Sequence, residues 1–427
     1  MKALRVLLIN DNSAHLNWGA QATPCALTGV LQRSLPGVEI VALPWDWLRR
    51  SYRRLRVSGI GEVVFRADSW RGVRPVLNRL SRSKDFYPGV ADDFDFCADE
   101  WMAGRGGPQA VEFLELARGA NVIVYNGENS IYLNTTEGCH GIFLLWLAKT
   151  RLDKPSCIVN HTAQLDDVRP IMSGMVKLVY PVLDLAAVRE PCSLANLQAL
   201  GITNAELFPD VVFAQDPGEF SRRTVEEWRL RHSLDDQKYF CVSASGLPVS
   251  MPRAGWDGEV TALVRDLKAG GLQAVLVAKD PWCLPFAEVA RRTDSLFFGP
   301  EHEFPDLWPL FQGASFLVTG HFHYVIFGAM VGCPFIPLSA NNHKMRGVCE
   351  HLGWQRTAPF DATSLRSCRA EIVAEARRLR ENRSELSAQL LETSATLRNE
   401  ARRLGMRVAE VAQSSKWTTA PESRGSL

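Results

Sequence analysis

The 427-residue sequence lacks an excess of charge of either sign, and this narrows the range of partners. It contains 48 basic and 47 acidic residues, which give a formal net charge of +1. Proteins that bind nucleic acids or anionic membranes mainly through charge usually carry a marked positive excess. The composition therefore disfavours a nucleic-acid partner.

Long apolar runs are also missing. No stretch reaches the roughly 18 uncharged apolar residues of a membrane-spanning helix, so we expect no transmembrane segment. The N-terminal MKALRVLLINDN has one short apolar run and no small-residue cleavage site, which is typical of a first β-strand rather than a signal peptide. We expect a cytoplasmic protein and leave peripheral contact with a membrane open.

The ten cysteines include no CxxC pair, which is the spacing common to redox motifs and zinc sites. Most of them lie in apolar runs such as SCIVN and FCVSAS. We therefore expect reduced thiols within the core.

Short runs rich in Val, Ile and Leu recur along the chain, each followed by a polar turn and a helical period. This alternation is typical of parallel sheets flanked by helices. Because the chain is longer than one hydrophobic core usually supports, we expect two such units. The predicted strands are LRVLLIN, VEIVALP, NVIVYNG, PSCIVN and LAAVRE in the first half, and KYFCVSAS, LQAVLVAK, SLFFG, SFLVTG and PFIPLS in the second.

The strand pattern divides the chain near residue 220, because the strands stop where residues 211–235 become polar. The predicted parts are a Rossmann-like acceptor-side domain over 1–220, a Rossmann-like donor-side domain over 221–368, C-terminal helices over 369–412 and a disordered tail over 413–427. Residues 46–110, rich in Arg, Trp and Gly, are predicted to be an irregular or helical insertion in the first domain.

This α/β organisation is that of the glycosyltransferase-B fold: two Rossmann-like domains followed by long C-terminal helices. In such folds ligands bind between the domains, at the carboxyl ends of the strands. The C-terminal helices would either fold back onto the first domain or form the seam of an oligomer.

The first turn of the first domain follows LRVLLIN and places Asn17, Gly19 and Gln21 at the start of a helix. The free amides of a helix N-terminus suit an anion or a sugar hydroxyl. The alternative is that Asn17 only caps the helix.

Polar residues follow two further strands of this half. Glu128 and Asn129 come after NVIVYNG, where a carboxylate could accept a proton from a sugar hydroxyl or, alternatively, stabilise the start of the next helix. Asn160, His161 and Gln164 follow PSCIVN in the same way, and we expect them to be polar lining.

Arg189 ends the strand LAAVRE, and Pro191 suits the first position of the helix that follows. A guanidinium at the crevice is a planar fork for phosphate or carboxylate. The alternative is an ion pair between Arg189 and Asp210. Ser193, in the same helix, is a further candidate for substrate binding.

His321 and His323 lie between the strand SFLVTG and a helix that ends at GCP. One interpretation is a metal site, which would need a third ligand such as His302 or His343, and no HExxH companion is present. A second is a pair of buried structural histidines. The third is a pair that binds an anion and transfers protons, with the imidazole charge linked to a bound phosphate.

The same edge of the crevice should receive polar residues from neighbouring turns. Asn342, His343 and Lys344 follow the strand PFIPLS, Ser245 ends KYFCVSAS, and Lys279 ends LQAVLVAK. We predict that these side chains form a polar rim for substrate.

Three blocks, taken in order, resemble the polysaccharide pyruvyl transferase family: NWGAQATPCAL, VREPCSLANLQALGITNAELFPD and TGHFHYVIFGAMVGCPFIPLSANNHK. The resemblance spans roughly residues 5–355. It implies a glycosyltransferase-B-like fold and transfer of the enolpyruvyl group of phosphoenolpyruvate onto two hydroxyls of a sugar, which forms a cyclic ketal and releases phosphate.

The resemblance also implies roles for single residues and partners. His323 would be the general acid, Arg189 would hold the phosphate or carboxylate of the donor, and His321 would complete this group. The acceptor would be a saccharide or lipid-linked saccharide of a surface-polysaccharide or exopolysaccharide pathway. Neither a metal nor another cofactor is implied.

Two positions depart from the family pattern. His321 stands where the family usually has the arginine of Arg-x-His, and Ala20 follows Gly19 where aspartate is common. Loss of a permanently charged fork leaves two alternatives open. One is a glycosyltransferase that uses a nucleotide-sugar donor, and the other is a non-catalytic saccharide-binding protein whose C-terminal helices recruit a partner.

Overall fold

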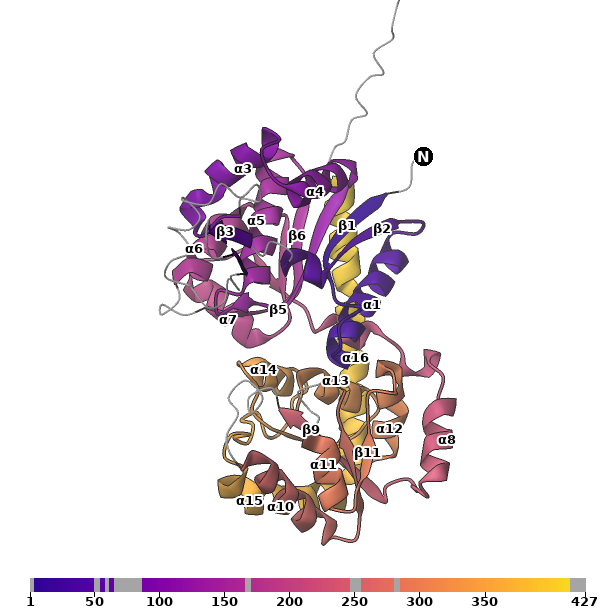
Figure 1. Ribbon diagram of the computed structural model, residues 1–427. Coiled ribbons are helices and arrows are strands. Elements are labelled where there is room, and N and C mark those ends of the chain that lie inside the picture. The colour runs from indigo at the N-terminus through magenta and orange to yellow at the C-terminus, as the bar shows by residue number, and fades with distance from the viewer. Residues whose placement is uncertain are drawn as a thin grey trace, which may run out of the picture.

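The computed structural model describes residues 4–49, 54–57, 61–64, 87–165, 170–245, 255–279 and 285–414. Within them, two parallel sheets form two α/β units that lie one above the other in Figure 1. Val6 and Leu8 of the first strand belong to one buried cluster, whereas Leu7 and Ile9 belong to another. Because successive strand side chains point to opposite faces, this sheet is covered on both faces, as its apolar runs predicted.

The first sheet has six parallel strands. Five of them confirm the strands predicted for the first half, and the sixth has the sequence AEL, which is not an apolar run and has no fully buried residue. In spatial order they are β2 (Glu39–Pro44), β1 (Arg5–Asp11), β5 (Val122–Tyr132), β6 (Ser156–Gln164), β7 (Leu185–Val188) and β8 (Ala205–Leu207). The helices of this unit are α1 (Trp18–Ser34), α3 (Phe94–Met102), α4 (Pro108–Gly119), α5 (Thr136–Arg151), α6 (Pro170–Val179) and α7 (Pro191–Ala199).

The second sheet has five parallel strands, and all five confirm the predicted ones. In spatial order they are β11 (Leu296–Phe298), β10 (Gln273–Val277), β9 (Tyr239–Ser245), β12 (Leu317–Gly320) and β13 (Phe335–Pro337). Its helices are α10 (Trp256–Lys268), α11 (Pro285–Arg292), α12 (Leu307–Gly313), α13 (Phe322–Met330) and α14 (Lys344–His351).

The insertion predicted over residues 46–110 lies partly outside the described residues. Its described part contains the 3-10 turn η1 (Trp45–Arg49), the antiparallel pair β3 (Arg54–Val57) and β4 (Gly61–Val64), helix α3 and the first turn of α4. The insertion is thus helical in part. The tail predicted over 413–427 lies outside the described residues from 415 onwards.

The segment between the two sheets contains two 3-10 turns, η5 (Val211–Ala214) and η6 (Pro217–Glu219), and helix α8 (Arg223–Arg231). The four residues of η5 are buried, and this turn packs against α1. Although the surrounding sequence is polar, η5 is therefore part of the first unit.

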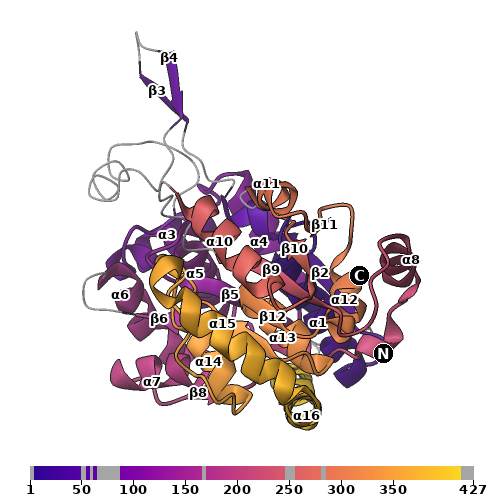
Figure 2. The same ribbon diagram turned by 90° about the horizontal axis from the view of Figure 1, so that it is seen from below.

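The C-terminal helices are α15 (Leu365–Glu381) and α16 (Arg383–Ser414), as the breaker-free sequence predicted. Figure 2 shows α15 lying across the second unit and leading into α16. Helix α16 packs against α1, η5 and β7 of the first unit and against α13 of the second, and it runs alongside both units in Figure 1. Of the two alternatives, the structure therefore shows the fold-back onto the first domain.

These elements confirm the predicted α/β fold with two Rossmann-like units and a long C-terminal helix. No helix in the described ranges is long and apolar enough to cross a bilayer. Six of the nine described cysteines are buried, as expected for core thiols.

Candidate active site

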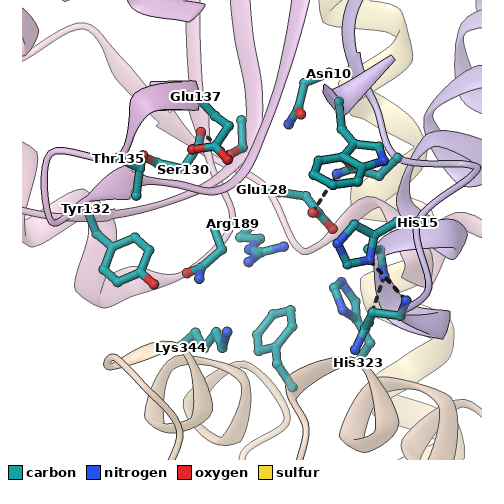
Figure 3. Close-up of a pocket in the computed structure, with 17 residues that line it drawn as sticks. Asn10, His15, Glu128, Ser130, Tyr132, Thr135, Glu137, Arg189, His323 and Lys344 are labelled. Carbon is teal, nitrogen blue, oxygen red and sulfur yellow. Dashed lines mark hydrogen bonds between the residues drawn. The ribbon is translucent and has the colours of Figure 1, made fainter. Parts of the chain in front are cut away.

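A cavity of about 370 Å³ lies where the carboxyl ends of the strands of the two units meet, as Figure 3 shows. In this view the first unit forms the upper wall, and His323 and Lys344 rise from the second unit below. Six residues that the sequence selected line it: Asn17, Glu128, Asn129, Arg189, His323 and Lys344.

Several lining residues were not selected from the sequence: Asn10, Asn12, His15, Trp45, Tyr132, Thr135, Glu137 and Phe322. Asn10 and Asn12 lie at the end of the first strand, and Trp45 directly follows β2, so the rule that ligands bind at strand ends could have found them. Tyr132 carried no such signal, because β5 continues beyond the predicted strand NVIVYNG.

His323 lies in the first turn of α13, after β12 ends at Gly320. Its side chain is 12% exposed, and its Nε2 atom is 3.6 Å from Oδ2 of Asp210. No described residue lies within hydrogen-bonding distance of this buried nitrogen. The imidazole is thus nearly enclosed, with its closest charged neighbour in the first unit.

Gly19 was predicted to bind substrate, but the structure places it against His323 instead. A Cβ atom built at residue 19 would lie 2.2 Å from Nδ1 of His323. Gly19 does not line the cavity. Its role in this structure is to leave room for the imidazole.

Asn17 caps α1, as its second alternative predicted, and it also lines the cavity. Its Oδ1 accepts a hydrogen bond from the backbone N–H of Ala20 at 3.0 Å, which caps α1. The same residue lines the cavity.

Arg189 forms the ion pair with Asp210 that its second alternative predicted, and it also lines the cavity. Its Nη1 donates to Oδ2 of Asp210 at 2.9 Å, and its Nε donates to Glu190 and Thr162, each at 3.1 Å. The guanidinium carbon lies 4.6 Å from the centre of the Phe322 ring. The hydrogen bonds to Asp210, Glu190 and Thr162 therefore engage Nη1 and Nε of the guanidinium.

Charge pairing sets the protonation of this cluster. Burial alone would raise the pKa of Asp210, but His323 and Arg189 together lower it below its usual range. Burial opposes the charge on Arg189, yet attraction to Asp210 and Glu190 raises the pKa of the guanidinium. Both groups are therefore charged at neutral pH.

Ser193 was predicted to contact substrate, but it is fully buried behind the cavity. Its hydroxyl donates to Oε2 of Glu190 at 2.6 Å and lies 3.1 Å from Nε2 of His343. Because the hydroxyl has only one hydrogen, His343 must be the donor in the second contact. His343 does not line the cavity either, and burial lowers its pKa. Ser193 and His343 thus support Glu190, which holds Arg189.

Glu128 is held by two residues of the first unit. Asn12 Nδ2 donates to its Oε2 at 2.7 Å, and Thr23 Oγ1 donates to its Oε1 at 2.9 Å. The alternative that Glu128 begins the next helix is wrong, because β5 continues to Tyr132 and α5 is capped by Thr135. Its backbone φ of +41° accompanies an irregularity in the pairing of β5 with β6.

Gln21 and Lys279 were predicted to bind substrate, but they form a bridge between the two units outside the cavity. Lys279 Nζ donates to Oε1 of Gln21 at 3.4 Å and pairs with Glu303 at 3.5 Å. Beside them, Trp18 Nε1 donates to the carbonyl oxygen of His302 at 3.0 Å. These contacts hold the start of α1 against the second unit.

The turn after β13 closes the opposite side of the crevice. Asn342 Nδ2 donates to Oδ1 of Asn129 at 2.5 Å, so Asn342 reaches a lining residue rather than lining the cavity itself. Lys344 does line the cavity. Burial, and secondarily repulsion from Arg189, lower the pKa of Lys344 to about 8.

His321 lines a smaller hollow of about 190 Å³ that shares Asn17, His323 and Lys344 with the main cavity. It is the N-cap residue of α13, and its ring centre lies 4.7 Å from that of Tyr324. The side chain of Ser245 lies outside the described residues.

The candidates for a third metal ligand are engaged elsewhere. His302 stacks on Phe298 with ring centres 3.7 Å apart, and His343 contacts Ser193. In the described ranges, no group of three or more His, Cys, Asp or Glu side chains is arranged to hold a metal ion.

The prediction that polar residues after PSCIVN line the cavity is wrong for His161, which lies within β6. This side chain is fully buried, its Nε2 lies 2.9 Å from the hydroxyl of Tyr180, and burial lowers its pKa to about 3. Asn160 accepts the backbone N–H of Val211 at 2.9 Å, and neither it nor Gln164 lines the cavity. Asn160 and His161, late in this inner strand, are therefore buried within the first unit and do not line the cavity.

Solved structures of several sugar-related proteins have a similar fold. The UDP-GlcNAc 2-epimerase of Neisseria meningitidis, bound to UDP-GlcNAc, has a TM-score of 0.54 at 10% identity, over 95% of this chain and 100% of that one. Anabaena Alr3699/HepE in complex with UDP and glucose has a TM-score of 0.53 at 12% identity, over 96% and 100%. A glycosyltransferase from Rickettsia africae has a TM-score of 0.52 at 9% identity, over 97% and 100%. At these identities the likeness concerns the fold alone.

No curated protein sequence matches this chain. A family model of polysaccharide pyruvyl transferases matches residues 37–342, which is well over half of the 427 residues. The match contains the second sequence block described above and the third as far as Asn342, and it leaves the first, at residues 17–27, outside. The chain therefore belongs to the polysaccharide pyruvyl transferase family.

Proposed function

We propose that this protein is a cytoplasmic pyruvyl transferase that moves the enolpyruvyl group of phosphoenolpyruvate onto a saccharide of a surface-polysaccharide or exopolysaccharide pathway. One observation carries the proposal: His323, Arg189 and Lys344 meet in one cavity with the carboxylate of Glu128. An acid, two cations and a base are the groups that ketal formation from an enol phosphate requires.

The cationic groups would hold the donor. Nη2 of Arg189 and Nζ of Lys344 are suited to the phosphate and carboxylate of phosphoenolpyruvate, and the first backbone N–H groups of α13 add a partial positive charge. Two carboxylates already attract Arg189, so Lys344 would supply much of the free positive charge.

Two residues that line the cavity would transfer protons, His323 as the acid and Glu128 as the base. His323 would protonate the methylene carbon of the donor, which leaves an oxocarbenium-like centre at C2. A sugar hydroxyl would attack C2 and lose its proton to Glu128. Cleavage of the C2–O bond would release phosphate and leave a second oxocarbenium-like centre at C2. A second hydroxyl would attack this carbon, close the ketal and return a proton to His323. The reaction consumes one donor and one diol and yields one ketal and one phosphate.

The wall formed by the first unit suits a saccharide acceptor, free or lipid-linked. It presents side-chain amides from Asn10, Asn12 and Asn129 beside the rings of Trp45 and Tyr132. Amides bond sugar hydroxyls, and aromatic faces pack against the apolar faces of sugar rings.

The test is to incubate the purified full chain with phosphoenolpyruvate and a panel of saccharides. Phosphate release and the mass of the product would be measured. His323→Ala should reduce turnover by about 100-fold or more, the contribution typical of a general acid. His232→Ala, at an exposed histidine, is the matched control and should leave turnover unchanged. Product formation that persists in His323→Ala would rule out the proposed acid.

A second candidate is glycosyl transfer from a nucleotide sugar. It is favoured by His321 at the usual arginine position and by the two carboxylates that already pair with Arg189. Calorimetric titration with phosphoenolpyruvate and with nucleotide sugars separates the two. Binding of a nucleotide sugar alone would select the second candidate, and binding of neither would favour a different donor altogether.

A further inference from the structure

Asp210 is a buried carboxylate that faces two of the proposed functional residues. It follows β8, immediately before η5, and is 1% exposed. Its Oδ2 accepts from Nη1 of Arg189 at 2.9 Å and lies 3.6 Å from Nε2 of His323. Oδ2 of Asp210 therefore faces both Arg189, the proposed donor-binding residue, and His323, the proposed general acid.

The other oxygen of Asp210 is occupied. Oδ1 accepts the backbone N–H of Val212 at 2.9 Å, which fixes the orientation of the carboxylate. Because the side chain cannot turn without losing this bond, Oδ2 is the atom left for His323.

His323 has no competing partner at Nε2. This nitrogen is buried, and no described residue lies within hydrogen-bonding distance of it. An unsatisfied buried polar atom destabilises the folded state, so a hydrogen bond at this position would be stabilising. Closing the gap from 3.6 Å needs a movement of less than about 1 Å.

The two residues belong to opposite walls of the crevice. Asp210 sits in the first unit, where η5 packs on α1 and α16, whereas His323 lies on α13 of the second unit. A small approach of the two units would therefore complete the contact. Gly19, also in the first unit, already lets the imidazole come close to α1.

We propose that Asp210 is the positioning residue of His323. Its Oδ2 accepts a hydrogen bond from Nε2–H, which holds one proton at that nitrogen and fixes the tautomer and orientation of the imidazole. The same oxygen keeps Arg189 in place beside the donor. This inference rests on the proposed function for its catalytic consequence, but the tautomer of His323 does not depend on it.

The experiment compares the full-length wild-type chain with Asp210→Asn by ¹⁵N NMR of the histidine side chains, with His323 assigned through His323→Gln. In the wild type, neutral His323 should carry its proton on Nε2. In Asp210→Asn the amide oxygen can keep the Val212 contact and turn its NH₂ group to His323, which favours a proton on Nδ1 instead. The kcat for phosphoenolpyruvate should fall by about 100-fold or more, because a wrong tautomer disables an acid–base histidine.

Asp216→Asn is the control, because Asp216 caps η6 in the same segment and does not contact His323. It should change neither tautomer nor kcat. Asp210→Glu should retain the wild-type tautomer. A wild-type His323 protonated on Nδ1, or an unchanged tautomer in Asp210→Asn, would overturn the inference.

The readouts also separate this inference from the proposed function. If Asp210→Asn does not fold, the tautomer of His323 in the wild type still tests the inference, because a proton on Nδ1 would overturn it. If the wild type does not turn over phosphoenolpyruvate, the donor assignment fails while the tautomer comparison stands.

Discussion

Gly19 and His323 share one space: the imidazole occupies the volume that a side chain at residue 19 would fill. A Cβ at that position would lie 2.2 Å from Nδ1, 2.6 Å from Cγ and 2.7 Å from Cβ of His323. The first and third sequence blocks, which are far apart along the chain, therefore meet at this contact. It ties the start of α1 to the proposed general acid.

Gly19→Ala should displace His323 and reduce turnover by about 100-fold, because an acid misplaced by about 1 Å loses its alignment with the substrate. Activity and the free energy of unfolding would be measured together. The second quantity should change far less than the first, since the affected contact borders a cavity.

Gly29→Ala is the matched control in the same helix. A Cβ at residue 29 would meet only Arg33, at 3.7 Å, an ordinary contact. Alanine is the better helix former by about 1 kcal/mol, so this variant should be fully active and slightly more stable. Equal activity losses in Gly19→Ala and Gly29→Ala would contradict the steric explanation.

His321→Arg should strengthen the binding of phosphoenolpyruvate. The residue lines the smaller hollow beside His323 and Lys344, and arginine would add a permanent charge with a bidentate fork. We expect about a tenfold lower Kd by calorimetry. His321→Lys adds charge without the fork and should gain less. No gain from either substitution would indicate a donor other than phosphoenolpyruvate.

Donor affinity should depend on pH through Lys344. Its pKa is lowered to about 8, mainly by burial, so the ammonium loses its proton as the pH rises through this value. An anion binds the charged form, so affinity should be highest below pH 8 and fall by up to about tenfold per pH unit above it. Calorimetry across this range gives the profile.

Lys344→Arg separates this residue from the other titrating groups. A guanidinium stays charged to beyond about pH 12, so this variant should retain its affinity where the wild type loses it. Lys344→Gln should bind weakly at every pH. A profile that falls equally in the wild type and in Lys344→Arg would assign the pH dependence to another group.

Leu404→Ala should destabilise the protein by about 2–5 kcal/mol, because α16 packs on both units and Leu404 is 1% exposed. Met406, two residues further along the same helix, is 50% exposed, so Met406→Ala should change the free energy of unfolding by less than about 1 kcal/mol. Denaturant unfolding measures both. Similar values for the two variants would argue against a structural role for the fold-back.

The strands could be predicted from the sequence because burial on both faces of a parallel sheet demands continuous apolar runs. LRVLLIN and SFLVTG are two examples, and each coincides with a strand to within two residues at either end. The strand β8 was not predictable, since its sequence AEL has no fully buried residue and no apolar run, unlike the equally short LFF of β11. Likewise, the start of α5 was misplaced because β5 continues through its irregular pairing at Glu128.

The candidate site was predictable only in part. Strand order and the strand-end rule placed Glu128, Arg189, His323 and Lys344 at one crevice, and the structure brings them to one cavity. Ser193, Gln21 and Lys279 satisfied the same rule, yet they are placed behind or beside it. The direction of a side chain at a strand end depends on its neighbours, which one sequence does not specify.

The sequence by itself determined the two parallel sheets, the helices between them and the residue types available at their carboxyl ends, because these follow from periodicity along the chain. Tertiary structure alone decided that Gly19 makes room for His323, that Asp210 faces both His323 and Arg189, and that α16 returns to the first unit. Those relationships join residues from separate elements. They arise only when long-range packing brings the elements together, and no local pattern encodes their distances.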